Sequence, residues 1–135
     1  MQRRSKLHFG FTLISLMVMV AIVGILAAIA YPSYINQVRD SRRTEAISLL
    51  MRAANKQEQY YAIEQTYADS MEKLDLPDNT EGEWYNVAVT KDSETEYTIK
   101  ASPQNDQTND DCGTFSIDET GEKSVGGSES AEACW

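Results

Sequence analysis

The residues of this 135-residue sequence that could do covalent or metal chemistry are few and far apart. The single histidine, His8, lies in a basic segment at the start of the chain, and the two cysteines, Cys112 and Cys134, lie near its end. A nucleophilic triad needs a histidine beside its serine or cysteine, and a zinc site needs more ligands at closer spacing. No glycine-rich phosphate loop occurs either. We therefore predict no enzymatic activity, no catalytic residues, no bound metal and no cofactor.

Oxygen-bearing side chains are concentrated between residues 105 and 111, in the run Asn-Asp-Gln-Thr-Asn-Asp-Asp. Calcium prefers such ligands, but the run lacks the glycine and the distant glutamate of an EF-hand loop. We predict a solvated acidic loop here, with calcium binding as the alternative.

An uncharged run from Phe11 to Ala30 dominates the N-terminal part of the chain. As a helix it would be about 30 Å long, which matches the hydrocarbon thickness of a bilayer. Three basic residues and no acidic residue precede the run, at Arg3, Arg4 and Lys6. The positive-inside rule would keep this end in the cytoplasm. The sequence therefore predicts one membrane-spanning helix, with the rest of the chain on the other side.

The two cysteines would then lie in an oxidising compartment, where thiols form disulfides. Pairing of Cys112 with Cys134 would close a loop of about 23 residues and stabilise the fold by about 3 kcal/mol through loop-closure entropy. The alternative is two free buried thiols. We predict the disulfide, whose contribution is large for a soluble part of roughly 85 to 100 residues.

The small residue Gly10 stands before the apolar run, whereas the cleavage site of an ordinary secretory signal follows the apolar region. This inverted order, the Gly-Phe-Thr-Leu-Ile run at residues 10–14 and the segment 24–34 resemble the prepilins of type IV pili, of the type IVa class. The resemblance implies cleavage between Gly10 and Phe11 by the prepilin peptidase, N-methylation of Phe11, and use of the apolar helix as filament core. The segment 111–121 and the final Cys134-Trp135 are similar to PilE-type minor pilins, which favours a minor subunit.

Three positions inside the apolar helix bear on assembly by helix packing. Ser15 stands where most pilins that this sequence resembles have Glu, whose carboxylate is thought to pair with the methylated N-terminus of a neighbouring subunit. Serine has no charge for that pairing, so either a tip subunit dispenses with the carboxylate or apolar packing suffices. The simpler interpretation is a hydrogen bond from Ser15 to its own backbone. Gly24 leaves a notch for another helix, and Pro32 removes an amide donor, so we expect the helix to bend or loosen there.

We predict an α+β fold of the type IV pilin kind. Its segments are a cleaved leader (1–10), a membrane and filament-core helix (11–35), an amphipathic helix that packs on the head (36–66), and a sheet with a disulfide-closed C-terminal region (67–135). Alternating apolar residues predict antiparallel strands at 84–90, 96–101 and 113–118, with a short fourth strand at 123–125. Helical spacing predicts the packing face of the helix, formed by Ala46, Ile47, Leu50, Ala54 and Tyr61. The segment 126–130 is expected to be flexible, with the disulfide holding it to the sheet and Trp135 packing at that edge.

Basic residues follow the apolar run at Arg39, Arg42 and Arg43. We expect them on a solvated helix face. They could contact anionic headgroups before assembly, or the acidic heads of neighbouring subunits after it.

The charge distribution favours a structural function. Nineteen of the 21 acidic residues follow Ala53, against five lysines, and this negative charge disfavours nucleic acid as a partner. We predict a minor pilus subunit that takes part in pilus assembly, with downstream roles in twitching motility, adhesion or DNA uptake. The alternatives are a pseudopilin of type II secretion and a DNA-binding uptake pilin.

The expected partners follow from this prediction. They are major and minor pilin subunits, the prepilin peptidase, the inner-membrane assembly machinery, and the membrane before assembly. We expect a single-pass inner-membrane protein with its head in the periplasm, and later a pilus subunit on the cell surface.

Overall fold

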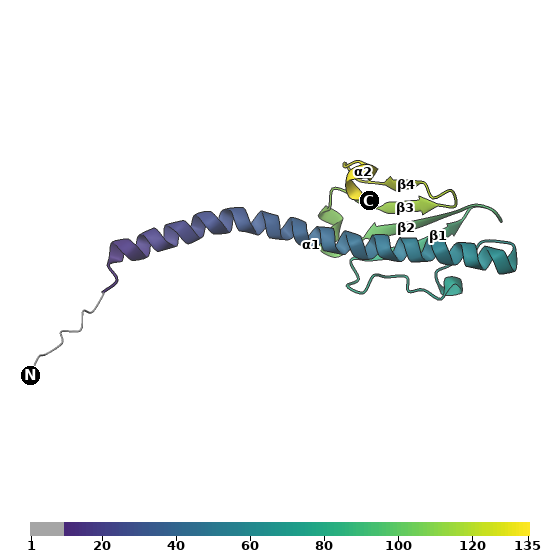
Figure 1. Ribbon diagram of the computed structural model, residues 1–135, viewed down its shortest axis with the longest axis horizontal. Helices are drawn as coiled ribbons and strands as arrows, with labels where there is room; N and C mark the ends of the chain where they lie inside the picture. Colours follow the sequence, from purple (N-terminus) through teal and green to yellow (C-terminus); the bar gives the residue numbers. More distant parts are fainter. Residues whose placement is uncertain (1–9) are drawn as a thin grey trace, which may run out of the picture. The chain divides into compact units, whose positions relative to one another are not determined.

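The computed structural model describes residues 10–135, so the basic leader with Arg3, Arg4, Lys6 and His8 lies outside the described part. A long helix, α1 (Leu13–Glu64), is followed by a 3₁₀ turn, η1 (Glu72–Leu74). The strands are β1 (Tyr85–Lys91), β2 (Tyr97–Pro103), β3 (Phe115–Asp118) and β4 (Lys123–Val125). A second 3₁₀ turn, η2 (Asn105–Asn109), precedes β3, and a short helix, α2 (Ala131–Cys134), follows β4 (Figure 1). The predicted α+β fold is confirmed.

The chain divides into two compact units, Met1–Gln37 and Val38–Trp135. We call the second unit the head. Helix α1 begins in the first unit and ends in the head, and it is helical on both sides of Pro32 without interruption. A proline removes one amide donor from the ladder of helical hydrogen bonds. The loosening expected near Pro32 therefore does not interrupt the helix in this structure.

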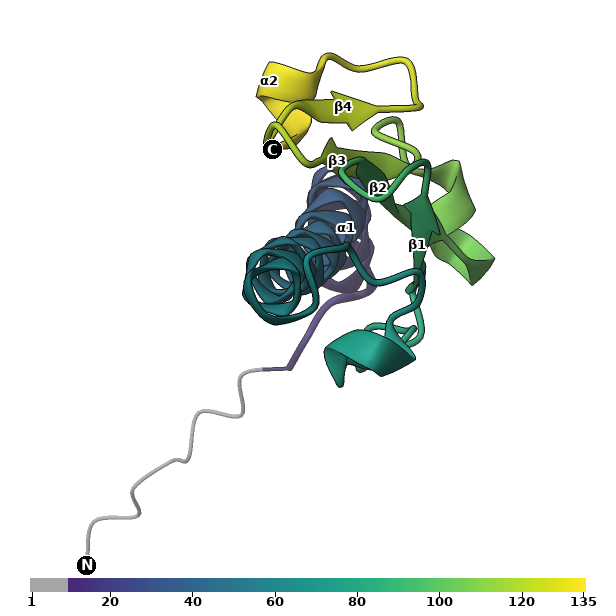
Figure 2. The ribbon, with the colours of Figure 1, turned by 90° about the vertical axis from the view of Figure 1, so that its right-hand side faces the viewer.

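The four strands form one antiparallel sheet in the order β1-β2-β3-β4. Val89, Ile99 and Ile117 stand opposite one another across β1, β2 and β3. Burial alternates along β1, β2 and β3, so one face of the sheet is apolar. This face packs against α1 in a common core, and the end-on view in Figure 2 shows the sheet beside the helix. All four predicted strands are confirmed, with ends that differ by at most two residues.

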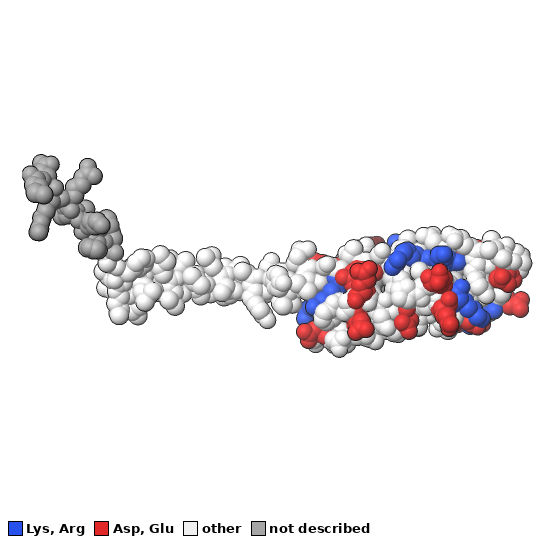
Figure 3. All heavy atoms as spheres, turned by 90° about the horizontal axis from the view of Figure 1, so that it is seen from below, with Lys and Arg blue, Asp and Glu red and all other residues white. Residues whose placement is uncertain are grey.

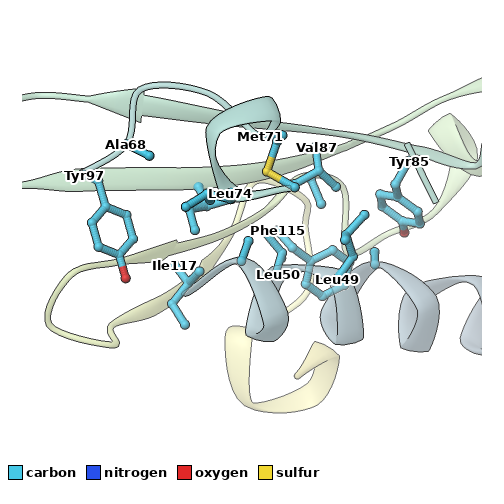
Figure 4. Packing of buried hydrophobic residues seen from close by; sticks show 14 of the residues in the cluster. Leu49, Leu50, Ala68, Met71, Leu74, Tyr85, Val87, Tyr97, Phe115 and Ile117 are labelled. Carbon is cyan, nitrogen blue, oxygen red and sulfur yellow. The ribbon is translucent and has the colours of Figure 1, made fainter. Parts of the chain in front are cut away.

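The core lies between this face of the sheet and the C-terminal part of α1 (Figure 4). Ala46 and Leu50 are fully buried, as predicted, whereas Ile47, Ala54 and Tyr61 are only partly buried. The buried face of α1 also includes residues that the predicted stripe lacks, namely Leu49, Ala53 and Gln57. The stripe is wider because a second segment, which contributes Tyr67, Ala68, Met71 and Leu74, joins the same core.

Gln57 shows how this segment is attached to α1. Its side chain is fully buried and binds the backbone of Ala68 twice, because Nε2 donates to the carbonyl oxygen (2.9 Å) and Oε1 accepts from the amide (2.8 Å). A buried amide side chain is tolerated only when such partners are present. Nearby, the Tyr67 ring lies between two other tyrosine rings, tilted toward Tyr61 with centroids 4.7 Å apart and edge-on to Tyr97 with centroids 4.6 Å apart.

Candidate functional site

The apolar residues at the start of α1 are exposed around the whole helix in the single chain. The large ones between residues 11 and 34 have exposed fractions from 51% for Ile22 to 76% for Phe11. This part of α1 is long and apolar enough to cross a membrane. Figure 3 shows no charged residue on the visible face of its described part. Since exposed apolar surface of this extent is costly in water, lipid or other helices must cover it.

Helix α1 starts with a set of hydrogen bonds between Thr12 and Ser15. The Thr12 amide donates to Ser15 Oγ (3.1 Å), and the Ser15 amide donates to Thr12 Oγ1 (3.3 Å). Ser15 Oγ lies 2.9 Å from the Thr12 carbonyl oxygen, to which it donates, and 2.7 Å from Thr12 Oγ1. Ser15 therefore makes the bond to the helix backbone that the sequence suggested. Gly10, Phe11 and Thr12 precede the first helical residue.

Gly10 and Gly24 have open space around them. A Cβ atom at either position would meet no heavy atom within 4 Å. Neither is among the described glycines with positive φ. A glycine inside a helix costs about 1 kcal/mol relative to alanine. Nothing in the described part of the chain therefore requires a glycine at either position.

A buried polar cluster joins α1 to β1 and η2. The Asp110 side chain is completely buried, and Arg43 binds both of its oxygens, with 2.7 Å between Nε and Oδ2. Tyr85 Oη (3.2 Å) and Gln107 Nε2 (2.9 Å) donate to the same carboxylate. Gln107 Nε2 also lies 3.4 Å from the Arg39 carbonyl oxygen.

Two expectations are corrected at this cluster, the first in part and the second fully. The loop around residues 105–111 is not solvated throughout, because the 3₁₀ turn η2 places Gln107 and Asp110, three residues apart, on one face that points inward. Arg43 is not on a solvated helix face, since it pairs with Asp110 of its own head. The same bonds occupy the oxygens of Asp110, so a calcium ion would have to displace Arg43. Within residues 10–135 no three His, Cys, Asp or Glu side chains are placed to hold a metal.

The cluster stabilises its own charges. The hydrogen bond to Asp110 raises the pKa of Arg43. Burial alone would raise the pKa of the Asp110 carboxyl, but the hydrogen bonds and charge of Arg43 outweigh burial and lower it. Burial also raises the pKa of Tyr85 to about 12. At neutral pH the cluster therefore holds an ion pair and a neutral phenol.

Arg42 also contacts the head of its own chain. Its guanidinium carbon lies 3.4 Å from the centroid of the Trp84 ring, a cation–π contact. Its terminal nitrogen lies 3.5 Å from Gln107 Oε1. The expectation of a solvated side chain is therefore wrong for Arg42 as well. Contacts of Arg39 with headgroups or neighbouring heads stay predictions.

The C-terminal region is closed by a disulfide between Cys112 and Cys134, as predicted. Backbone bonds also hold the following segment, because Gly127 N donates to the Cys112 carbonyl (3.0 Å) and Ser128 N to that of Asp111 (2.8 Å). Gly127 lies so close to the backbone of Asp111 that a Cβ atom at this position would stand 1.9 Å from the Asp111 carbonyl oxygen. We expected residues 126–130 to be flexible. This is wrong for residues 126–129, because their amides donate hydrogen bonds to carbonyl oxygens within residues 111–114.

Trp135 packs at the same edge of the sheet, as predicted. Its ring lies edge-on to Phe115 with centroids 5.6 Å apart, and its Nε1 donates to the Ser124 carbonyl oxygen (3.2 Å). The arrangement of these residues offers packing surfaces, and it brings together no nucleophile and base.

The sequence interpretation missed the Arg43–Asp110 pair and the buried amide of Gln57. A signal for the Arg43–Asp110 pair was present in the sequence, because Gln107 stands three residues before Asp110 and the buried Cys112 follows two residues after it. The second had none, since a polar residue at position 57 matches the solvated face equally well.

Two sequence families match the chain. The family described as "Type IV minor pilin ComP, DNA uptake sequence receptor" matches residues 32–116. The "Prokaryotic N-terminal methylation motif" matches residues 6–31.

Curated relatives are similar over part of the chain. The fimbrial protein EcpC of Eikenella corrodens is 33% identical over 93 residues, which are 69% of this chain and 61% of that protein. The type IV major pilin protein PilA of Myxococcus xanthus is 43% identical over 60 residues, 44% of this chain and 27% of that protein. The matches thus span less than two thirds of the length of these relatives.

Solved structures share the fold. A type IV pilin from Shewanella oneidensis aligns with a TM-score of 0.55 and 26% identity, over 72% of this chain and 97% of that one. The non-core minor pilin PilV of Neisseria meningitidis aligns with a TM-score of 0.55 and 23% identity, over 70% of this chain and 94% of that one.

Proposed function

This chain belongs to the type IV minor pilin family whose sequence pattern spans residues 32–116, and from this premise we propose that it is a minor structural subunit of a type IV pilus. The observation that carries the proposal is the uncharged start of α1, which is exposed around the helix and begins three residues after Gly10. Such a helix is stable in a bilayer before assembly and in a bundle of similar helices afterwards.

Processing by the prepilin peptidase is the first step that we propose. The enzyme would cut between Gly10 and Phe11, and the new N-terminus at Phe11 would be methylated. The match of residues 6–31 to the methylation motif supports this step. The open surroundings of Gly10 also support this step. No contact within the described chain requires a small residue at this position, whereas recognition by a peptidase would require one.

Assembly through the apolar helix is the second step. A Cβ atom at Gly24 would meet nothing within 4 Å, so a helix of another subunit could approach there closely. Pro32 lies near the end of this surface. Ser15 has no carboxylate with which to neutralise a neighbouring N-terminus, so apolar packing and not a buried ion pair would hold the subunit in place.

The location follows from the same steps. The precursor would span the inner membrane once with its head in the periplasm, where the Cys112–Cys134 disulfide could form. The assembly machinery would then move it into a surface pilus among major and minor subunits. Motility, adhesion or DNA uptake would depend on that pilus.

The experiment is mass spectrometry of the chain from sheared surface pili, with and without an active prepilin peptidase. We expect a form that begins with methylated Phe11 in the pili, and an intact precursor in membranes when the peptidase is inactive. A full-length chain in both samples would refute the processing, and absence from the pili would refute the subunit role. The variant Ser15→Glu, in the same assay, should increase the amount of subunit in pili only if the missing carboxylate limits docking.

A receptor for DNA is the second candidate, because the matched family is described by that activity. Lys100 lies exposed on the outer face of β2, between Ala88 and Ser116 of the adjacent strands, and has no acidic residue directly opposite. The nineteen acidic residues after Ala53 oppose DNA binding. A gel-shift series with the head at several salt concentrations tests whether the head binds DNA. Tight binding that weakens steeply with salt and with Lys100→Gln would establish the receptor role.

A further inference from the structure

The first turn of α1 is arranged as a reciprocal cap. Thr12 stands immediately before the first helical residue, Leu13, and its hydroxyl accepts from the Ser15 amide (3.3 Å). In return, Ser15 Oγ accepts from the Thr12 amide (3.1 Å). This is the geometry of a capping box, in which the third residue of the helix usually is Glu or Gln. Here a serine fills that place, and its shorter side chain still reaches the amide.

The cap decides where the helix begins. The first amides of a helix have no partner within it, and in lipid an unpaired amide is more costly than in water. The Thr12 and Ser15 side chains satisfy two of these amides. Without them, the amides could be satisfied by starting the helix earlier, which would draw Phe11 and Gly10 into it. Among the described residues no other contact opposes this, since Phe11 is 76% exposed and Gly10 has open space around it.

The start of the helix matters for the bond between Gly10 and Phe11, which lies outside α1 in this structure. A peptidase has to reach the carbonyl carbon of the bond that it cuts. In a helix that peptide is held by backbone hydrogen bonds, so the turn must open before cleavage. A helix that starts at Leu13 leaves the bond free.

We propose that Thr12 and Ser15 are positioning residues for leader removal, and that their mutual cap starts α1 at Leu13 and so keeps the Gly10–Phe11 bond outside the helix. This proposal rests on the proposed processing by prepilin peptidase. It also gives Ser15 a role that a hydroxyl can perform without a charge. The cap acts on the precursor, before the subunit meets any neighbour.

The test follows leader removal from the full-length precursor, in membranes that contain the prepilin peptidase, by gel mobility and mass. Thr12→Val keeps the shape of the side chain and removes the hydroxyl, and Ser15→Ala removes the other half of the cap. We expect each to slow cleavage about two- to thirtyfold, the range that loss of an N-cap gives for a two-state equilibrium. Thr12→Ser and Ser15→Glu keep a capping oxygen and should be cleaved at nearly the rate of the unchanged chain.

A second measurement separates a cap from a direct contact with the enzyme. The carbonyl ¹³C shifts of Gly10 and Phe11, measured by NMR on the precursor in detergent micelles, should be non-helical in the unchanged chain and helical in Thr12→Val. Slow cleavage of Thr12→Val without this change, or slow cleavage of Thr12→Ser, would overturn the cap and indicate contact with the peptidase. Equal rates for all five chains would overturn it too. If no chain loses its leader, the proposed processing itself is wrong, whatever the NMR shifts show.

Discussion

Replacement of Arg43 by methionine should destabilise the head strongly at neutral pH. The change keeps the length of the side chain but leaves the buried Asp110 carboxylate without its cation, with Tyr85 and Gln107 as the remaining side-chain donors. Removing one partner of a buried ion pair costs about 3–5 kcal/mol. The Arg43 side chain is 21% exposed, so water can reach part of the site and we expect about 2–4 kcal/mol. For a domain of this size each kcal/mol lowers Tm by about 4–8 °C.

The dependence on pH identifies the mechanism. In the unchanged head the pKa of Asp110 is lowered, so its contribution to stability is present above the ordinary aspartate pKa and is lost as pH falls through the lower folded value. In the Arg43→Met variant no cation offsets the burial of Asp110, so burial should raise the pKa of this carboxyl. The variant should then lose most stability relative to the unchanged head at pH 7 to 8, and should approach the unchanged head as the pH falls and Asp110 takes up a proton.

Thermal unfolding of the head between pH 4 and 8, followed by circular dichroism, measures both effects. The double variant Arg43→Met with Asp110→Leu should recover much of the loss, because an apolar pair can replace a buried ion pair. Arg52→Met is the matched control, since Arg52 is exposed on the same helix and should change stability by less than about 0.5 kcal/mol. A loss below about 1 kcal/mol for Arg43→Met that is the same at every pH would refute the reasoning, since a lost buried pair costs several times as much.

Three further outcomes follow from the head. Gly127→Ala should cost about 2 kcal/mol or more in urea unfolding, because its Cβ would collide with a backbone oxygen at 1.9 Å; Gly126→Ala, with its nearest atom at 3.5 Å, is the control and should cost much less. Replacing Cys112 and Cys134 by serine should lower the free energy of unfolding by about 2–5 kcal/mol relative to the oxidised head. If the unchanged head had the same urea midpoint with and without reductant, this prediction would be contradicted. The phenol of Tyr85 should titrate near pH 12 by ultraviolet absorbance. Since its folded pKa is raised, the stability that it confers is complete below pH 10 and is lost as the pH rises toward 12, so an ordinary phenol titration would contradict the buried cluster.

Local patterns were enough to predict most of the fold. Alternation of apolar and polar residues depends only on the two-residue period of a strand, so all four strands could be located. The pairing of Cys112 with Cys134 followed from the compartment, and the exposed apolar start of α1 followed from its length and lack of charge. The hydrogen bond from the Ser15 hydroxyl to the Thr12 carbonyl oxygen is likewise a contact between residues only three positions apart.

The sequence by itself determined the long apolar helix, the sheet and the disulfide, because each depends on the nature of residues that are close in the chain or on their number. The tertiary structure alone decided which polar residues are buried. Arg43 and Asp110 lie 67 positions apart, and Gln57 is matched to a single backbone unit at Ala68. A charge becomes buried only when another element closes over it and provides the opposite charge, and no periodicity along the chain contains that information.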